Sequence, residues 1–216
     1  MRRLGCLVFV LLILGALLFV ADSAATSYAE ERIEARLARV YDTEADVELV
    51  GWPVSARILL TGHIPEARIS TGDVRLGGGA TIDRLDVVLT ELSVRLDDLR
   101  GETGNRLPPA EAGRYKATLD EQSVGSLLGA AGGLVDVSLD SDLLTLSAGS
   151  LSVDASVEAR DGDVIVAVAG PLAQLMGGAE FPIDLSDQPG SPAVDDVAIN
   201  NGLLVLRGTL DEVRRP

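Results

Sequence analysis

The sequence is poor in the residues that most enzymes use for chemistry. Its only cysteine is Cys6 and its only histidine is His63, in a turn where a surface or capping role is expected. Zinc sites draw mainly on cysteine and histidine, so the usual zinc ligand sets are missing. A lone cysteine also excludes an internal disulfide. Neither a Gly-x-Ser-x-Gly nor a Ser-x-x-Lys pattern occurs. We therefore predict a protein that is not an enzyme, without catalytic residues, metal site or cofactor.

Aromatic residues are scarce as well. Beyond residue 25 the aromatic residues are Trp52, Phe181, Tyr28, Tyr41 and Tyr115. The core must therefore be aliphatic, and it is either thin or partly filled by something other than side chains. Such faces suit a sheet curled around an apolar cavity that holds acyl chains. The alternative is that the same faces simply pack on helices and on one another.

Positive charge is the third deficit. The chain has 18 Lys and Arg against 33 Asp and Glu, a formal net charge of −15. Such a surface repels phosphate backbones, which excludes nucleic acid as a partner. Paired aspartates, such as Asp140 with Asp142 and Asp161 with Asp163, fall at predicted turns, where aspartate bonds its own backbone. None of the acidic pairs fits a calcium-binding loop.

The one long apolar run stands at the N-terminus. Arg2 and Arg3 precede eighteen uncharged residues, Leu4 to Ala21. This pattern predicts export, with the rest of the chain outside the cytoplasmic membrane in the cell envelope. Ser23-Ala24-Ala25 is a cleavage site of the usual kind, yet eighteen apolar residues also reach the lower limit for spanning a bilayer. We interpret residues 1–27 as a signal peptide or a membrane anchor, with the anchor slightly favoured.

Beyond residue 28, alternation of apolar and polar residues dominates and predicts strands with one dry and one wet face. Helical spacing is confined to Tyr28–Tyr41, with Ile33, Leu37 and Val40 on one stripe, and to a short helix near Val124–Leu128 capped by Asp120 or Ser123. Strands are predicted at 47–49, 67–71, 82–96, 115–119, 135–139, 144–146, 151–157, 164–168, 181–185, 194–199 and 203–210.

Loops and two short apolar segments bounded by glycine separate these strands. Gly101–Gly113 and Pro189–Pro192 are predicted loops. The apolar segments, called knuckles here, are Trp52–Leu60 and Leu172–Met176, and their similarity raises the hypothesis of a duplicated sheet-plus-knuckle architecture. We expect an α+β, mainly β, fold in a single domain over 28–216. It would be an elongated curled antiparallel sheet or barrel with an N-terminal helix and short helical knuckles.

Several motifs resemble a known family. They are Leu49-Val50-Gly51-Trp52-Pro53-Val54, Leu59-Leu60-Thr61-Gly62-His63-Ile64-Pro65, Tyr115-Lys116-Ala117-Thr118-Leu119-Asp120-Glu121 and Val197-Ala198-Ile199-Asn200-Asn201-Gly202-Leu203-Leu204-Val205. In this order, after an N-terminal apolar segment, they resemble the LmeA-type phospholipid-binding proteins of actinobacterial cell envelopes. Family members commonly carry Phe after the knuckle proline, where this chain has Val54. The resemblance implies a fold related to tubular lipid-binding proteins, phospholipid binding, and a role in envelope lipid or lipoglycan assembly.

These observations lead to a hypothesis for the site. The protein would hold the acyl chains of a phospholipid in an apolar groove whose mouth includes Trp52, Val54, Ile58, Leu59 and Ile64, with Arg57 and Arg68 as headgroup contacts. An equally weighted interpretation makes the apolar residues a core plug at the end of the sheet. The alternative function is a non-catalytic envelope scaffolding module that binds a protein partner through an open sheet edge or the Tyr28–Tyr41 helix.

Overall fold

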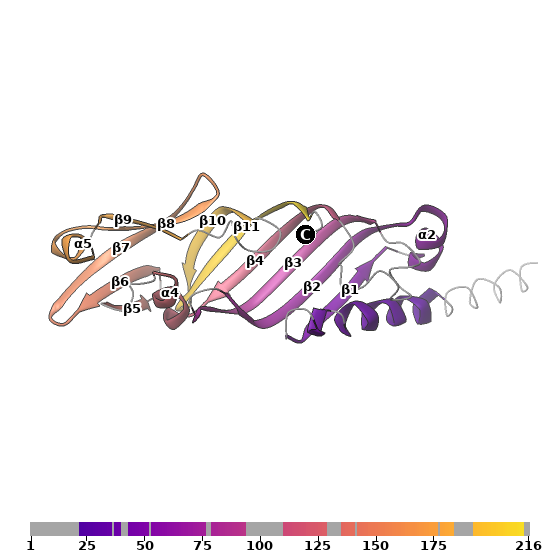
Figure 1. Ribbon diagram of the computed structural model, residues 1–216, viewed down its shortest axis with the longest axis horizontal. Helices are drawn as coiled ribbons and strands as arrows, with labels where there is room; N and C mark the ends of the chain where they lie inside the picture. The colour runs from indigo at the N-terminus through magenta and orange to yellow at the C-terminus, as the bar shows by residue number, and fades with distance from the viewer. Residues whose placement is uncertain are drawn as a thin grey trace, which may run out of the picture.

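The computed structural model describes residues 22–35, 37–39, 43–51, 53–76, 79–93, 110–128, 135–140, 142–176, 178–183 and 192–213. The molecule is elongated and mainly β, with a six-stranded and a five-stranded antiparallel sheet that follow one another along the long axis (Figure 1). This confirms the predicted fold class, an N-terminal helix and short helical knuckles included. The strands are divided between two open sheets, however, and the described strands do not close into a barrel.

The six-stranded sheet combines the two ends of the chain. Its strand order is β1 (Ala45–Val50), β2 (His63–Arg75), β3 (Thr81–Ser93), β4 (Ala110–Leu119), β11 (Leu203–Val213) and β10 (Pro192–Asn200). The predicted closing hairpin is thus confirmed as β10 and β11, and β11 joins the sheet beside β4. A long chain separation lies between β4 and β11, and the entire five-stranded sheet is inserted there.

The register of the six-stranded sheet gives it one apolar and one charged face. Val47, Ile69, Val87 and Tyr115 stand opposite one another across β1 to β4. The adjacent row holds Glu48, Arg68, Val88 and Arg114, whose side chains point to the other face because side chains alternate along a strand. We call these the inner and the outer face. The predicted dry and wet faces are therefore confirmed for this sheet.

The five-stranded sheet is the predicted meander. Its strands follow in sequence as β5 (Asp136–Asp140), β6 (Leu143–Ala148), β7 (Leu151–Arg160), β8 (Asp163–Val168) and β9 (Glu180–Ile183). One face is again apolar, and four of its residues are completely buried: Leu144, Leu146, Val164 and Val166. These side chains share a core with Leu119, Leu204 and Leu206 of the six-stranded sheet. A backbone hydrogen bond from Val194 N to Gly162 O, 2.8 Å, links the two sheets directly.

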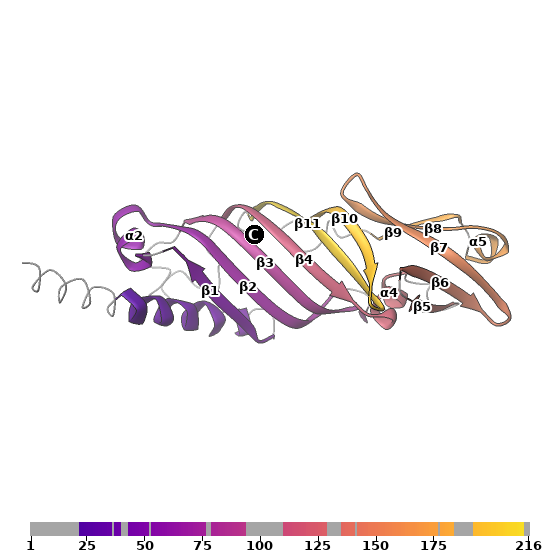
Figure 2. The ribbon, with the colours of Figure 1, turned by 180° about the vertical axis from the view of Figure 1, so that it is seen from behind.

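Short helices lie at both ends of the molecule and at the junction of the sheets. α2 (Val54–Thr61) and α5 (Pro171–Met176) are the two predicted knuckles, at opposite ends, and α4 (Glu121–Leu127) lies where the sheets meet (Figures 1 and 2). Asp120 caps α4, because its Oδ1 accepts a hydrogen bond from Ser123 N at 2.7 Å. Each knuckle connects two antiparallel neighbours, β1 to β2 and β8 to β9. The duplication of a sheet-plus-knuckle architecture stays a prediction.

A helix covers the edge strand β1. Residues 22–35 and 37–39 are helical, so the predicted domain boundary at residue 27 falls inside a helix that packs on the sheet. Ala29 and Leu37 are buried and Ile33 is partly buried against β1, β2 and α2, in a second core separate from the first. The predicted stripe of Ile33 and Leu37 is thus confirmed, whereas Val40 lies outside the described residues.

The predicted loop over 101–113 lies outside the described residues up to position 109, and the prediction was wrong at its end, since β4 begins at Ala110. Gly113 is the reason why the beginning of this strand was not predicted. Its inner-face position has no room for a side chain, because a Cβ there would lie 2.9 Å from Leu89 Cδ2 and 3.2 Å from Leu210 Cβ. The alternation therefore breaks at Gly113 although the strand continues. Val94 and Leu96, predicted as the end of β3, lie outside the described residues.

Candidate functional site

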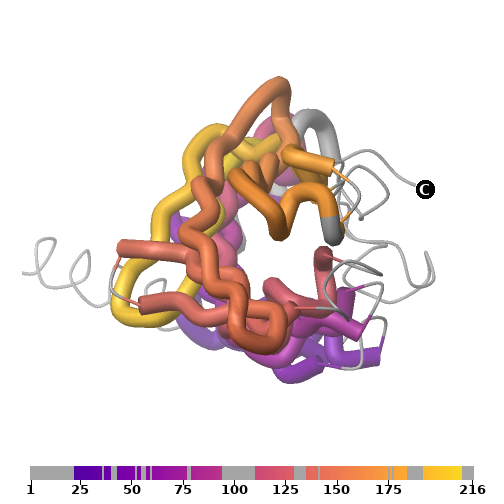
Figure 3. The backbone as a smooth tube through the Cα atoms, turned by 90° about the vertical axis from the view of Figure 1, so that its left-hand side faces the viewer, coloured from indigo at the N-terminus to yellow at the C-terminus, as the bar shows by residue number. Residues whose placement is uncertain are grey.

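The inner face of the six-stranded sheet is only partly covered at its middle. One core fills the space between the two sheets, and the other lies under the N-terminal helix. Between them, on neighbouring strands, are apolar side chains that are only partly buried: Ile69, Leu85, Val87, Leu89 and Leu210. We call these five residues the inner band. The sheets wrap around the long axis, as the end-on view shows (Figure 3), so the inner face is concave.

The register makes the inner band continuous. Ile69 pairs with Val87, and Leu89 pairs with Gly113, which in turn pairs with Leu210. Glycine at the centre of this row lets the leucines on both sides close over the backbone. The band is therefore an uninterrupted aliphatic strip across β2, β3, β4 and β11.

Tyr115 borders the band on one side. It pairs with Gly208, and its ring lies across that glycine, since a Cβ at Gly208 would be 2.8 Å from Tyr115 Cε1. The hydroxyl donates a long hydrogen bond, 3.4 Å, to Ala193 O. Burial, aided by the negative charge of Asp195, raises the pKa of Tyr115 to about 12. The phenol therefore stays neutral at physiological pH and adds no charge to the band.

The outer face of the same sheet is charged. Arg68 contacts Glu66 at 2.8 Å and Glu48 at 3.4 Å, and Arg84 contacts Asp86 at 3.1 Å. Burial alone would raise the pKa of Asp86, but hydrogen bonds from Ser70 and Arg84, together with the positive charges of Arg84 and Lys116, outweigh it and hold that pKa below its usual value. The sheet thus separates an apolar concave side from a charged convex side.

Three of the five residues predicted to form the mouth of a groove are buried in a core instead. Val54, Ile58 and Ile64 are 4%, 8% and 1% exposed and belong to the core under the N-terminal helix. This arrangement favours the core-plug interpretation for these three. Trp52 and the side chain of Leu59 lie outside the described part of the chain.

The two predicted headgroup contacts also lie apart. Arg57 is exposed on α2, at the end of the molecule. Arg68 is on the outer face and engaged with Glu48 and Glu66, so the sheet stands between it and the inner band. The structure therefore does not bring the two arginines together.

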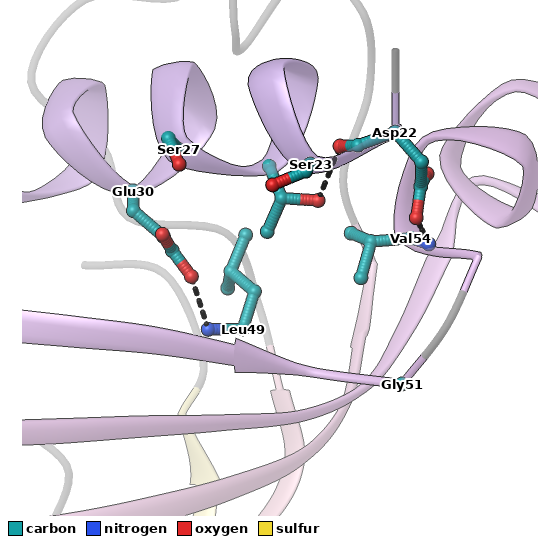
Figure 4. Close-up of a pocket in the computed structure, with 8 residues that line it drawn as sticks. Asp22, Ser23, Ser27, Glu30, Leu49, Gly51 and Val54 are labelled. Atoms are coloured by element: carbon teal, nitrogen blue, oxygen red, sulfur yellow. Dashed lines mark hydrogen bonds between the residues drawn. The ribbon is translucent and has the colours of Figure 1, made fainter. Parts of the chain in front are cut away.

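A small open pocket of about 310 Å³ lies between the N-terminal helix, β1 and α2 (Figure 4). Three of its polar side chains have hydrogen-bond partners, and two of these are carboxylates: Glu30 Oε1 accepts from Leu49 N at 2.9 Å, and Asp22 Oδ2 accepts from Val54 N at 3.2 Å. Thr26 Oγ1 donates to Asp22 O at 2.9 Å. Hydroxyls and carboxylates do not suit an acyl chain, so this pocket is a poor lipid site.

Other kinds of site are not evident in the part of the chain that the structure describes. Within those residues, no group of three or more His, Cys, Asp or Glu side chains is placed to hold a metal ion. No helix within the same residues is long and apolar enough to cross a membrane.

The sequence analysis recognised the strands of the inner band but not their role. The signal that could have identified the site was glycine inside strands, at Gly113 and Gly208, beside aliphatic inner-face residues. Glycine in a strand marks a close approach of side chains or of a ligand to the backbone.

Comparison with known proteins identifies the family. No curated protein and no solved structure matches the chain. The family described as LmeA-like phospholipid-binding matches residues 20–209, which include both knuckles and both sheets except for the end of β11. Because this match covers nearly the whole length, the chain belongs to the LmeA-like phospholipid-binding family.

Proposed function

We propose that this protein is an exported, non-enzymatic carrier or sensor that binds a phospholipid by laying its acyl chains along the inner band. The observation that carries the proposal is the strip of partly exposed aliphatic side chains on the concave face: Ile69, Leu85, Val87, Leu89 and Leu210. Removing a methylene from water contributes about 0.8 kcal/mol, so even a partial acyl contact along this strip favours binding. Family membership supports phospholipid as the ligand class.

The inner band is a better acyl site than the predicted knuckle. Val54, Ile58 and Ile64 already bury their side chains in protein, whereas the band residues keep apolar surface in contact with solvent. A site lined only by aliphatic groups selects acyl chains by length and shape, and the headgroup would remain at the solvent side. Support for the envelope role, in lipid or lipoglycan assembly, comes from the apolar N-terminal run and from the family.

The proposed location is the cell envelope, outside the cytoplasmic membrane. Residues 1–27 would direct export and would either anchor the chain in the membrane or release it after cleavage. The helix from residue 22 packs on β1, and Asp22 accepts a hydrogen bond from Val54 N. A cut after Ala25 would remove this contact, which favours the anchored form.

Crosslinking tests the acyl site. The full-length chain in its own membranes is incubated with a phospholipid that carries a photoreactive diazirine on one acyl chain, and the crosslinked peptides are identified by mass spectrometry. We expect crosslinks in the β2, β3 and β11 peptides that contain the inner band. Crosslinks confined to outer-face residues, or none above the level of a membrane protein of unrelated fold, would contradict the proposal.

A matched pair of substitutions sharpens this test. Val87→Glu puts a carboxylate into the inner band, where an acyl chain would have to displace its water, and should reduce crosslinking about tenfold or more. Val88→Glu changes the next residue of β3, which stands between Arg68 and Arg114 on the outer face, and should leave crosslinking unchanged. Equal effects of the two substitutions would exclude the inner band as the acyl site.

The scaffolding alternative has less support. At the edge strand β1, the backbone N–H groups of Val47 and Leu49 already donate to Glu34 and Glu30 of the N-terminal helix. An added strand from a partner would have to displace this helix first.

A further inference from the structure

α2 presents the most exposed large apolar side chain of the described residues. Leu60 is 85% exposed, against 55% for Leu143, the next highest. Val54 and Ile58, one helical turn apart, are buried against the core, and Arg57 and Leu60 are exposed. A single exposed leucine is common on protein surfaces. Whether Leu60 marks a contact surface therefore depends on the residues around it.

The helix holds Leu60 in a fixed position. α2 ends at Gly62, which has a φ of 70° and donates its N–H to Arg57 O at 3.2 Å and Ile58 O at 3.1 Å. Thr61 Oγ1 also donates to Arg57 O, at 2.8 Å. The last turn is therefore closed, and the outward direction of Leu60 is built into the fold.

The segment that forms α2 differs in charge from the rest of the chain. No carboxylate occurs between Glu48 and Glu66, although the chain has 33 acidic residues. Arg57 is exposed and forms no ion pair with any side chain in the described ranges. The segment that forms α2 therefore adds no negative charge that would repel anionic lipid headgroups, and the neighbouring carboxylate of Asp22 accepts a hydrogen bond from Val54 N.

The N-terminal apolar run enters the domain at the same end. Asp22, which directly follows Leu4–Ala21, accepts a hydrogen bond from Val54 N, the first residue of α2, at 3.2 Å (Figure 4). Asp22, the residue at which the chain leaves this run, therefore lies next to α2. A bilayer suits that run, since its length reaches the lower limit for a span and Arg2 and Arg3 precede it.

We propose that α2 rests on the membrane surface, with Leu60 among the acyl chains and Arg57 at the headgroup phosphates. The molecule then projects from the membrane by its α2 end, with the five-stranded sheet at the far end (Figure 1). This inference rests on the membrane attachment proposed above and is independent of lipid uptake by the inner band.

Site-directed labelling of the full-length chain tests this orientation. In a Cys6→Ser background, which removes the only cysteine, Leu60→Cys and Leu143→Cys are each labelled with the same environment-sensitive dye and reconstituted in vesicles of phosphatidylcholine and phosphatidylglycerol. We expect quenching by lipid-attached nitroxide at residue 60 and not at 143. Access of aqueous iodide to residue 60 should be about tenfold lower than its access to residue 143. This is the factor by which a leucine-sized apolar group prefers the membrane to water.

The outcomes separate the two proposals. Equal iodide access at residues 60 and 143 would overturn membrane contact by α2, whatever the crosslinking result for the inner band. Adding Arg57→Glu should weaken nitroxide quenching at residue 60 in anionic vesicles, and no change would remove Arg57 from the contact. Val87→Glu should leave the quenching at residue 60 intact, and if it abolished that quenching, α2 docking would not be independent of the band.

Discussion

Replacing both Glu30 and Glu34 by alanine should open the edge of the six-stranded sheet. The N-terminal helix presents these two carboxylates, four residues apart, to β1. Glu30 Oε1 accepts from Leu49 N at 2.9 Å and Glu34 Oε1 accepts from Val47 N at 3.1 Å. The two glutamates thus replace the carbonyl groups of a missing neighbouring strand, and their loss leaves the edge strand open to pairing with another chain.

The expected cost follows from these contacts. A hydrogen bond to a charged group contributes about 1.5–3 kcal/mol, and less where water can replace it. Both contacts are only partly buried, so we expect about 1 kcal/mol each and about 2 kcal/mol for the pair. Local opening of β1 would then be about 30 times more frequent in the double variant.

Hydrogen–deuterium exchange with mass spectrometry measures this opening in peptides that span residues 45–50. The double variant should exchange faster there, while peptides from β6 and β8 keep their protection. Glu31→Ala is the matched control, because Glu31 is exposed on the same helix and has no hydrogen bond to β1. If the double variant exchanged over 45–50 no faster than the control, the two glutamates would not protect the edge.

Two further substitutions test the packing of glycines. Gly208→Ala should destabilise the protein by about 3 kcal/mol or more, measured by urea unfolding, because its Cβ would lie 1.9 Å from Ala193 O and 2.8 Å from the Tyr115 ring; a change below about 1 kcal/mol would show that β10 can shift freely. Gly125→Ala, in the middle of α4, meets only Val137 Cγ2 at 3.4 Å and should raise stability by about 0.5–1 kcal/mol in the same assay. Destabilisation by Gly125→Ala would indicate that α4 is packed more tightly than this contact implies.

Much of the fold could be predicted from local pattern. Alternation is a property of consecutive residues, so it identified the strands of the meander and the faces of β3 without tertiary information. Glycine and proline marked the two knuckles, and the position of Asp120 before a short apolar segment predicted the cap of α4. The aliphatic composition, the lack of catalytic motifs and the family resemblance are all properties of the sequence, and together they pointed to lipid binding.

Tertiary structure alone decided which apolar residues are buried and which are available. Ile58, predicted at the mouth of a groove, is buried in the core under the N-terminal helix, whereas Leu85 of β3 stays partly exposed. That helix is close to β1 because Glu30 and Glu34 match the spacing of two backbone N–H groups, a relation between distant segments.

The division of the strands into two sheets could not be predicted from the sequence for the same reason. Pairing of β11 with β4 joins residues about ninety positions apart, as in Gly208 with Tyr115, and no local pattern specifies that partner. The sequence by itself determined the strands, their apolar faces and the family. Which strands pair, and therefore where the inner band remains open to a ligand, was decided by contacts between segments far apart in the chain.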